Sequence, residues 1–241
     1  MADASDPRDA DAPDPSSPAT PTPTGRARTL AASLLEIGAV ELRPADPFTW
    51  TSGLAAPIYC DNRLTIAYPD VRRAIRDGFA ALLDEEGLLP ATIAGTATAG
   101  IPHAAWLAEA VDRPMAYVRD EAKGHGTGAR IEGRVRAGDD VVLVEDLIST
   151  GGSALDAVAA LRDAGARVRA VLAIFSYGLE VAARGFDEAE VACHVLTDFG
   201  VLVDVAHAEG RLSDAERETL RAWRADPGAW SVQHGGARPG A

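Results

Sequence analysis

Residues 141–153 read Val-Val-Leu-Val-Glu-Asp-Leu-Ile-Ser-Thr-Gly-Gly-Ser. Four consecutive apolar residues, three of them β-branched, predict a strand buried on both faces, as in a parallel sheet. Two carboxylates, Glu145 and Asp146, follow at once, and a Ser-Thr-Gly-Gly turn then leads into a helix that begins at Ser153. The backbone N–H groups of such a turn and the helix N-terminus form a phosphate-binding site. The acid pair beside it predicts a ligand with vicinal hydroxyls and a phosphate, namely a sugar phosphate.

Helices and strands alternate along the rest of the chain. Two short strands are expected within 48–61, and the glycine-rich segment 120–138, which has no apolar period, is expected to be a mobile loop. This order is typical of an α/β domain with a doubly wound parallel sheet. Apolar runs predict the sheet strands at 92–95, 115–118, 141–145, 168–175 and 192–196, and amphipathic or capping patterns predict helices at 28–37, 70–86, 102–111, 153–164 and 213–223.

Ligands of doubly wound sheets bind outside the carboxyl ends of the strands. Glu145, Arg119 and the small-residue turn 95–100 all follow predicted strands, so we expect them to converge on one site. The turn after Glu145 is not a triphosphate-binding loop, because no Gly-Lys-Ser/Thr follows its glycines. It is not a dinucleotide-binding fingerprint either, because the acids precede the glycines.

The composition is that of a soluble globular protein, with 47% hydrophobic and 24% charged residues. A net charge of −13 argues against a nucleic-acid partner, and a saline habitat or a GC-rich genome would equally explain it. No apolar run approaches the roughly 20 residues of a membrane span, and the N-terminus lacks the apolar region of a signal peptide. Cys60 and Cys193 have no metal-ligand spacing, so we expect buried free thiols in a cytoplasmic protein.

The two ends of the chain differ from its middle in composition. Residues 1–25 are rich in Asp, Pro, Ser, Thr and Ala, which predicts a disordered acidic tail. Residues 233–241 are glycine-rich and are expected to form a flexible tail. The segment between them, 26–232, has no linker and no repeat, so we expect a single domain there.

Lysine usage singles out one residue. Of the 23 basic residues counted as Lys or Arg, Lys123 is the only lysine. A compact ammonium on a flexible stem does what a planar guanidinium does not, so this exception points to a function. Lys123 lies in the glycine-rich loop, two residues before His125.

Residues 141–153 resemble the phosphoribosyl-pyrophosphate (PRPP) motif of the type I phosphoribosyltransferases, in the Glu-Asp form typical of a bacterial branch. Other segments resemble the orotate phosphoribosyltransferases, in the family's order and over about residues 28–230. Phe48-Thr-Trp-Thr-Ser-Gly53 and Pro57-Ile-Tyr-Cys-Asp-Asn-Arg63 are similar to the family's N-terminal hood, Gly95-Thr-Ala-Thr-Ala-Gly-Ile-Pro102 to its pyrophosphate-side loop, and Arg119-Asp-Glu-Ala-Lys-Gly-His-Gly126 to its mobile catalytic loop.

The resemblance implies a hood at about 28–65, completed by C-terminal elements, above the sheet. It implies transfer of the phosphoribosyl group from PRPP to orotate, giving orotidine 5′-monophosphate and pyrophosphate in pyrimidine biosynthesis. Mg²⁺ would be bound through PRPP, with Asp146 as a candidate ligand. The family's dimers imply a homodimer whose loop 119–130 acts in the partner's site. Arg119, Lys123 and His125 are then the catalytic residues, because they would neutralise the leaving pyrophosphate.

The resemblance also divides the binding residues between the two substrates. Arg63 is a candidate partner for the orotate carboxylate, because a guanidinium pairs bidentately, and a structural salt bridge under the hood is the alternative. The residues implied for PRPP are Arg119, Lys123, His125, Glu145, Asp146, Leu147, Ile148, Ser149, Thr150, Gly151, Gly152 and Ser153. Those implied for orotate are Ser149, Ser52, Gly53, Tyr59 and Arg63.

This chain has fewer cations than the family's better-known pattern. Either Arg63 and Arg130 supply the missing positive charge, or Mg²⁺ neutralises more of the phosphate charge. The positions where many members carry a cation and this chain does not are Thr51, Ala99, Asp120 and the segment Ser176-Tyr177.

Two other functions compete with the orotate reaction. A phosphoribosyltransferase for a purine or for uracil shares the PRPP motif, but the hood segments 48–53 and 57–63 argue against it. A PRPP-sensing regulator would keep the motif without the chemistry. It would lack loop cations such as Lys123 and His125, or carry a basic DNA-binding region, which this sequence does not show.

Overall fold

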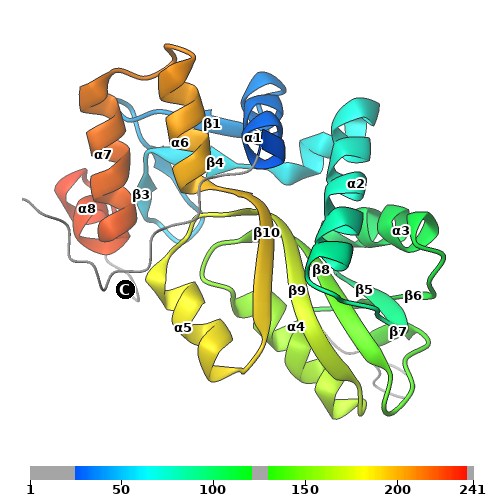
Figure 1. Ribbon diagram of the computed structural model, residues 1–241. Helices are drawn as coiled ribbons and strands as arrows, with labels where there is room; N and C mark the ends of the chain where they lie inside the picture. The colour runs from blue at the N-terminus through cyan, green and yellow to red at the C-terminus, as the bar shows by residue number, and fades with distance from the viewer. Residues whose placement is uncertain (1–24, 121–129, 238–241) are drawn as a thin grey trace, which may run out of the picture.

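The computed structural model describes residues 25–120 and 130–237, and its centre is a six-stranded sheet (Figure 1). The strand order is β10-β9-β8-β5-β6-β7, and every pair is parallel except β6 with β7. The predicted doubly wound α/β class is therefore confirmed, with an antiparallel strand at one edge. The strands are β5 (Thr92–Thr96), β6 (Met115–Val118), β7 (Ile131–Gly133), β8 (Asp140–Ile148), β9 (Arg167–Ser176) and β10 (Ala192–Asp198).

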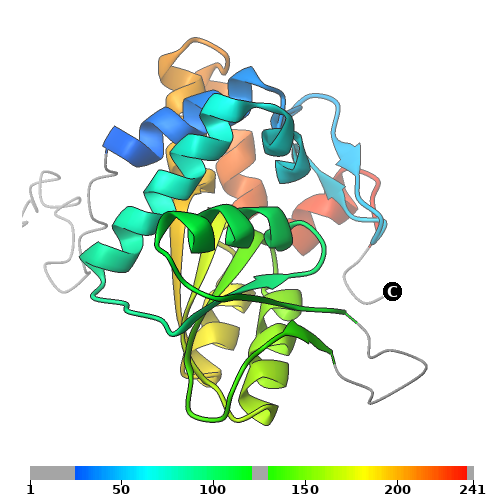
Figure 2. The same cartoon turned by 90° about the vertical axis from the view of Figure 1, so that its right-hand side faces the viewer.

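Helices cover both faces of this sheet (Figure 2). One face carries α1 (Gly25–Glu36), α2 (Pro69–Glu85) and α3 (Gly100–Ala110), and the other carries α4 (Gly152–Asp163) and α5 (Glu180–Glu188). Because both faces are covered, the central strands are apolar throughout: Val141, Val142, Leu143 and Val144 are all 0% exposed. None of the helices within 25–120 and 130–237 has both the length and the apolar character needed to cross a membrane.

Two small antiparallel strand pairs and a 3₁₀ helix, called the hood below, lie above the carboxyl ends of the sheet strands (Figure 1). The pairs are β1 (Val40–Leu42) with β4 (Ile58–Cys60), and the hairpin of β2 (Phe48–Thr49) with β3 (Ala55–Ala56). The 3₁₀ helix η1 (Asn62–Ala67) follows β4, and the side chain of Asp61 caps it.

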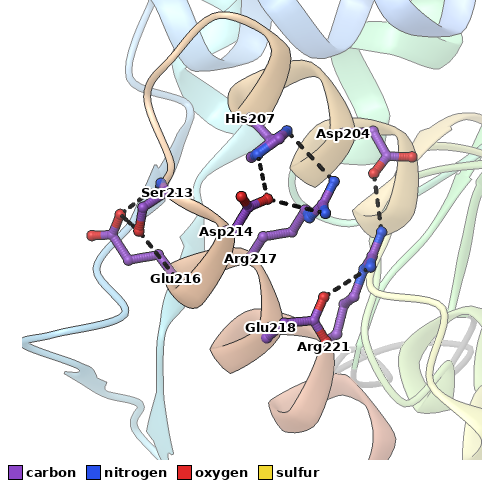
Figure 3. A network of polar contacts seen from close by, with 8 residues as sticks. All are labelled: Asp204, His207, Ser213, Asp214, Glu216, Arg217, Glu218 and Arg221. Atoms are coloured by element: carbon purple, nitrogen blue, oxygen red, sulfur yellow. Dashed lines mark hydrogen bonds and ion pairs between the residues drawn. The ribbon is translucent and has the colours of Figure 1, made fainter.

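The C-terminal helices α6 (Phe199–Ala208), α7 (Asp214–Ala225) and α8 (Pro227–Gln233) support the hood from the side. Polar contacts join α6 to α7, where His207 Nε2 lies 3.0 Å from Asp214 Oδ1 (Figure 3). The buried Trp223 ring lies edge-on to Trp50 of the hood at 5.8 Å and to Tyr177 after β9 at 5.7 Å. The base of the hood is thus an aromatic cluster shared by three distant parts of the chain.

The C-terminal segment also holds the β2–β3 turn by hydrogen bonds. The Ser231 hydroxyl accepts from the Ala55 N–H at 2.9 Å and donates to the Ala237 carbonyl at 2.8 Å. The Ala237 N–H donates to the Gly53 carbonyl at 2.9 Å. The part of the expected flexible tail that the structure describes, up to Ala237, is therefore bound to the hood.

The element boundaries differ from the expected ones where tertiary contacts decide them. The capping box predicted at Ser213 and Glu216 is present, but α8 follows α7, which was expected to be the last helix. Strand β7 lies inside the segment expected to be a loop, paired with β6. The helices α5 and α6 and the strand β1 were not predicted either; β1 is held by its pairing with β4.

Candidate active site

The acid pair lies inside strand β8 rather than after it. The strand was predicted to end at residue 145, but Leu147 and Ile148 still pair with Phe175 and Ser176 of β9. Glu145 is 6% exposed, and its Oε1 accepts the backbone N–H of Asp146 at 3.0 Å. The β9 pairing therefore extends the strand and buries the first acid near the carboxyl edge of the sheet.

The turn after β8 has the geometry of an anion-binding helix N-terminus. Gly151 has a φ of 83°, which favours glycine, and no side chain caps α4, which begins at Gly152. The first N–H groups of a helix lack partners within the helix, so they are available to a ligand. Ser149 is half-buried, whereas Thr150 and Ser153 are exposed. These residues, predicted to hold a phosphate, lie together at the end of β8.

The turn between β5 and α3 approaches β8 very closely. A Cβ atom on Gly100 would lie 2.4 Å from the carbonyl oxygen of Val144, so only glycine fits there. The Thr96 hydroxyl donates to the same carbonyl at 3.2 Å. The 95–100 turn, whose Ala97–Thr98 peptide bond is cis, therefore lies beside the acid pair, as the sequence predicted.

The predicted base-binding residues fall into two groups. Tyr59 is 41% exposed, and its ring lies 5.6 Å from that of Phe48. Ser52 and Gly53 lie in the β2–β3 turn, where the Gly53 N–H donates to the Trp50 carbonyl at 2.8 Å and the Gly53 carbonyl accepts from the Ala237 N–H.

Arg63 is held in place by its neighbour Asp61. Its Nε donates to Asp61 Oδ1 at 2.6 Å and its Nη2 to Oδ2 at 2.8 Å. The pair is largely in water, since the Arg63 side chain is 65% exposed, so it contributes little to stability. Arg63 also lies near enough to Asp146 for its charge to lower the pKa of that acid. The sequence alternative of a salt bridge is thus present, and it leaves one edge of the guanidinium exposed.

The loop cations are only partly described. Arg119 and Arg130 are joined where β6 meets the chain leading into β7: the Arg119 N–H donates to the Arg130 carbonyl at 2.8 Å. The Arg130 guanidinium binds the Arg119 carbonyl at 3.0 Å and Asp156 of α4 at 3.2 Å. Its charge is thus already paired. Lys123 and His125 lie outside the described residues.

Burial determines the charge of the acid pair. Loss of water around Glu145 raises the pKa of its carboxyl well above the usual range, and the nearby Asp146 raises it further. Burial also raises the pKa of Asp146, although the charge of Arg63 opposes this. Two adjacent carboxylates suit a hard cation such as Mg²⁺, but in the described part of the chain no three acidic, His or Cys side chains gather to hold a metal. A magnesium ion there would need most of its oxygen ligands from the substrate.

One residue of this site was missed by the sequence analysis. Asn62, at the start of η1, is 1% exposed, and its Nδ2 donates to the backbone carbonyl of Asp146 at 2.6 Å. The segment 57–63 was assigned to the hood, but nothing in its pattern shows which side chain turns inward. Its position directly before Arg63, a predicted orotate-binding residue, was the only signal in the sequence.

Comparisons with known proteins agree with this geometry. A family model described as the phosphoribosyl transferase domain matches residues 67–209. The chain is 52% identical over 205 residues to an orotate phosphoribosyltransferase of Bacillus cereus, covering 84% of this chain and 98% of the relative. It is 53% identical over 201 residues to one of Bacillus caldolyticus, covering 83% and 97%.

Two solved structures have the same fold. An orotate phosphoribosyltransferase from Aeropyrum pernix matches with a TM-score of 0.66 and 29% identity, over 76% of this chain and 99% of that one. A UMP synthase from Leishmania donovani matches with a TM-score of 0.71 and 27% identity, over 83% of this chain and 42% of that one. The match thus covers nearly the whole length of the Aeropyrum pernix protein.

The buried acid predicts an unusual pH dependence of stability. Because the pKa of Glu145 is higher in the folded than in the unfolded chain, the folded state holds a proton that the unfolded state has lost. The stability of the ligand-free protein should then fall as pH rises above about 4.3, the unfolded value. We expect Glu145→Gln to flatten this slope and to exceed the wild type in free energy of unfolding at pH 8. Urea denaturation at pH 5, 6.5 and 8 measures the free energy of unfolding of both proteins.

The exposed Glu188 of α5 provides the control, since Glu188→Gln removes a carboxylate that is in water in both states. Parallel pH profiles for Glu145→Gln and the wild type would contradict the assignment of the slope to Glu145.

Proposed function

We propose how the residues of this site divide one reaction among them, given that the chain belongs to the orotate phosphoribosyltransferase family. The protein is a phosphoribosyl (pentosyl) transferase of pyrimidine biosynthesis with PRPP and orotate as substrates. Orotate displaces pyrophosphate from C1 of the ribose, giving orotidine 5′-monophosphate. The observation that carries the division is the acid pair Glu145–Asp146 near the carboxyl end of β8, from which a short turn leads to the uncapped N-terminus of α4.

The end of β8 and the turn into α4 hold the ribose and its 5′-phosphate. The carboxyl groups of Glu145 and Asp146 accept hydrogen bonds from the two ribose hydroxyls, which the oxygens of a protonated or an ionised carboxyl can both do. The N–H groups and hydroxyls of residues 149–153 bind the phosphate, which the partial positive charge of the helix N-terminus also favours. These interactions fix the sugar and leave its C1 atom to the other two segments.

The pyrophosphate leaves toward the 95–100 turn and the loop 119–130. Arg119, Lys123 and His125 neutralise the charge that grows on the leaving group. Asp146 would help PRPP to hold a Mg²⁺ ion, which would supply further positive charge there. The loop closes over the site of the partner in a homodimer, as its resemblance to the family's mobile loop suggests. With Arg130 paired to Asp156, Lys123 is the cation best suited to move with the substrate.

The hood recognises the base. Tyr59 offers an exposed ring beside Phe48, and Arg63 offers a guanidinium that Asp61 orients bidentately. Orotate brings a carboxylate, and the exposed edge of Arg63 can bind it without losing Asp61. Ser52, Gly53 and Ser149 complete the predicted base-binding set. We place the enzyme in the cytoplasm, with 26–232 as its catalytic domain.

The activity has a direct test. With orotate, PRPP and Mg²⁺, the purified protein should consume orotate, which is followed by its ultraviolet absorbance. Adenine, hypoxanthine and uracil at the same concentration serve as competing bases. Turnover of any of them with no consumption of orotate would overturn the base assignment.

Lys123 is expected to act on the chemical step. We expect Lys123→Ala to lower kcat by about 10²- to 10³-fold, the usual loss for one group that stabilises transition-state charge. The Kd for PRPP, measured by titration calorimetry, should change much less. Lys123→Arg keeps the charge but not the compact ammonium, so partial recovery separates charge from shape. An unchanged kcat in Lys123→Ala would remove this residue from the mechanism.

Arg63 is expected to act on the base. Arg63→Ala should raise the KM for orotate about 10-fold or more, because a bidentate charged hydrogen bond is lost, and leave the KM for PRPP nearly unchanged. Arg211, which pairs with Glu209 at the same two-residue spacing between α6 and α7, gives the matched control in Arg211→Ala. If both variants bind orotate like the wild type, another residue reads the carboxylate.

A further inference from the structure

A buried chain of polar side chains runs beneath the active site, across three elements. His103 of α3, Thr65 and Asn62 of η1 are 1%, 0% and 1% exposed. His103 Nε2 lies 3.3 Å from the Thr65 hydroxyl, which donates to the main-chain carbonyl of Asn62 at 2.6 Å. The Asn62 amide then reaches the Asp146 carbonyl on β8 at 2.6 Å.

The direction of each hydrogen bond follows from the acceptors. The Asn62 atom that faces the Asp146 carbonyl must be the NH₂ group, because a second oxygen would be repelled there. The Thr65 hydroxyl has one hydrogen, which it donates to the main-chain carbonyl of Asn62. His103 must therefore donate from Nε2 to Thr65, in its neutral form. Burial supports this, since it lowers the pKa of His103 to about 4.

Stability alone does not explain this row of buried polar side chains. The Asn62 Oδ1 and His103 Nδ1 atoms are buried, and within the described residues they have no hydrogen-bond partner. Each such atom has lost its hydration without gaining a hydrogen bond, which destabilises the folded state. Apolar side chains of similar volume would avoid this cost, so the polar chain is retained for the geometry that it imposes.

Three members of this row of polar contacts lie next to segments assigned to the active site. Asn62 lies directly between Asp61 and Arg63 of the hood. His103 lies on the first turn of α3, which begins at Gly100, where the 95–100 turn ends. Asp146 is one of the two acids proposed to bind the ribose. The polar chain thus connects the base side, the pyrophosphate side and the ribose side of the site.

We propose that Asn62 is a positioning residue for PRPP: its amide fixes the Asp146 carbonyl, and Thr65, itself in contact with His103, holds the main chain of Asn62 in the position that allows this. The inference rests on the proposed role of Glu145 and Asp146 in binding the ribose. A peptide plane that is held at its carbonyl also orients the adjacent side chain, so a loosened Asn62 would let the Asp146 carboxylate move from the ribose hydroxyls.

The experiment compares Asn62→Leu, of similar volume but without the amide, with the wild type. We expect the Kd for PRPP, from titration calorimetry, to rise about 10-fold or more, in the range found when groups that orient a ligand-binding side chain are removed. The KM for orotate should change less than 3-fold. The urea midpoint should change little, since the variant removes the unpaired Asn62 Oδ1 but also leaves the Asp146 carbonyl without this donor. Leu64→Ala, on the exposed side of the same 3₁₀ helix, is the control.

Thr65 provides a second route that does not depend on Asn62→Leu folding. Thr65→Val removes the hydroxyl at nearly constant volume and should weaken PRPP binding about 3- to 10-fold, whereas Thr65→Ser should restore it. In the double variant the two effects should be less than additive, because both act through the same contact to Asp146.

Each outcome decides one point. If Asn62→Leu or Thr65→Val is folded and binds PRPP within 2-fold of the wild type, the positioning role is overturned. If both substrates weaken equally together with a fall in the urea midpoint, Asn62 is only a structural contact and the proposal fails. Failure of the wild-type protein itself to bind PRPP would instead contradict the proposed function.

Discussion

Burial of a carboxylate at the carboxyl end of β8 is the constraint on which the rest of the site depends. Glu145 sits where the sheet is covered on both faces, so its charged form is disfavoured and its pKa is raised. A site of this kind is stable only if neighbouring groups hold the strand in register. The pairing with β9, the approach of Gly100 to Val144 and the amide of Asn62 all do so.

The same constraint determines where the positive charge must come from. The protein carries a net charge of −13, yet its substrate has many phosphate oxygens. Arg63 and Arg130 are already paired with Asp61 and Asp156. Their pairing makes them rigid rather than unavailable, since a guanidinium has five N–H donors and a bidentate pair uses two. Fixed arginines can orient a ligand, whereas a charge that follows the leaving group needs a flexible residue such as Lys123.

The sequence predicted the parts of the structure that local signals encode. The apolar run before Glu145 and the glycines before α4 predicted the β8–α4 unit, because burial and a positive φ each demand particular residue types there. The extension of β8 through Ile148 could not be predicted from the local sequence, since it depends on pairing with β9. The inward turn of Asn62 depends on the hood meeting β8, two segments that are 84 residues apart.

The hood illustrates how far base recognition depends on distant residues. Its strands are only two or three residues long, and an isolated hairpin of that size is not stable in water. It is held in place by contacts with Trp223 of α7, with Ser231 of α8 and, through Asn62, with Asp146 of β8. The first two contacts join the hood to the C-terminal helices, and the third joins it to the acids that we propose bind the ribose. In the proposed site, base and sugar are therefore aligned by contacts that touch neither substrate.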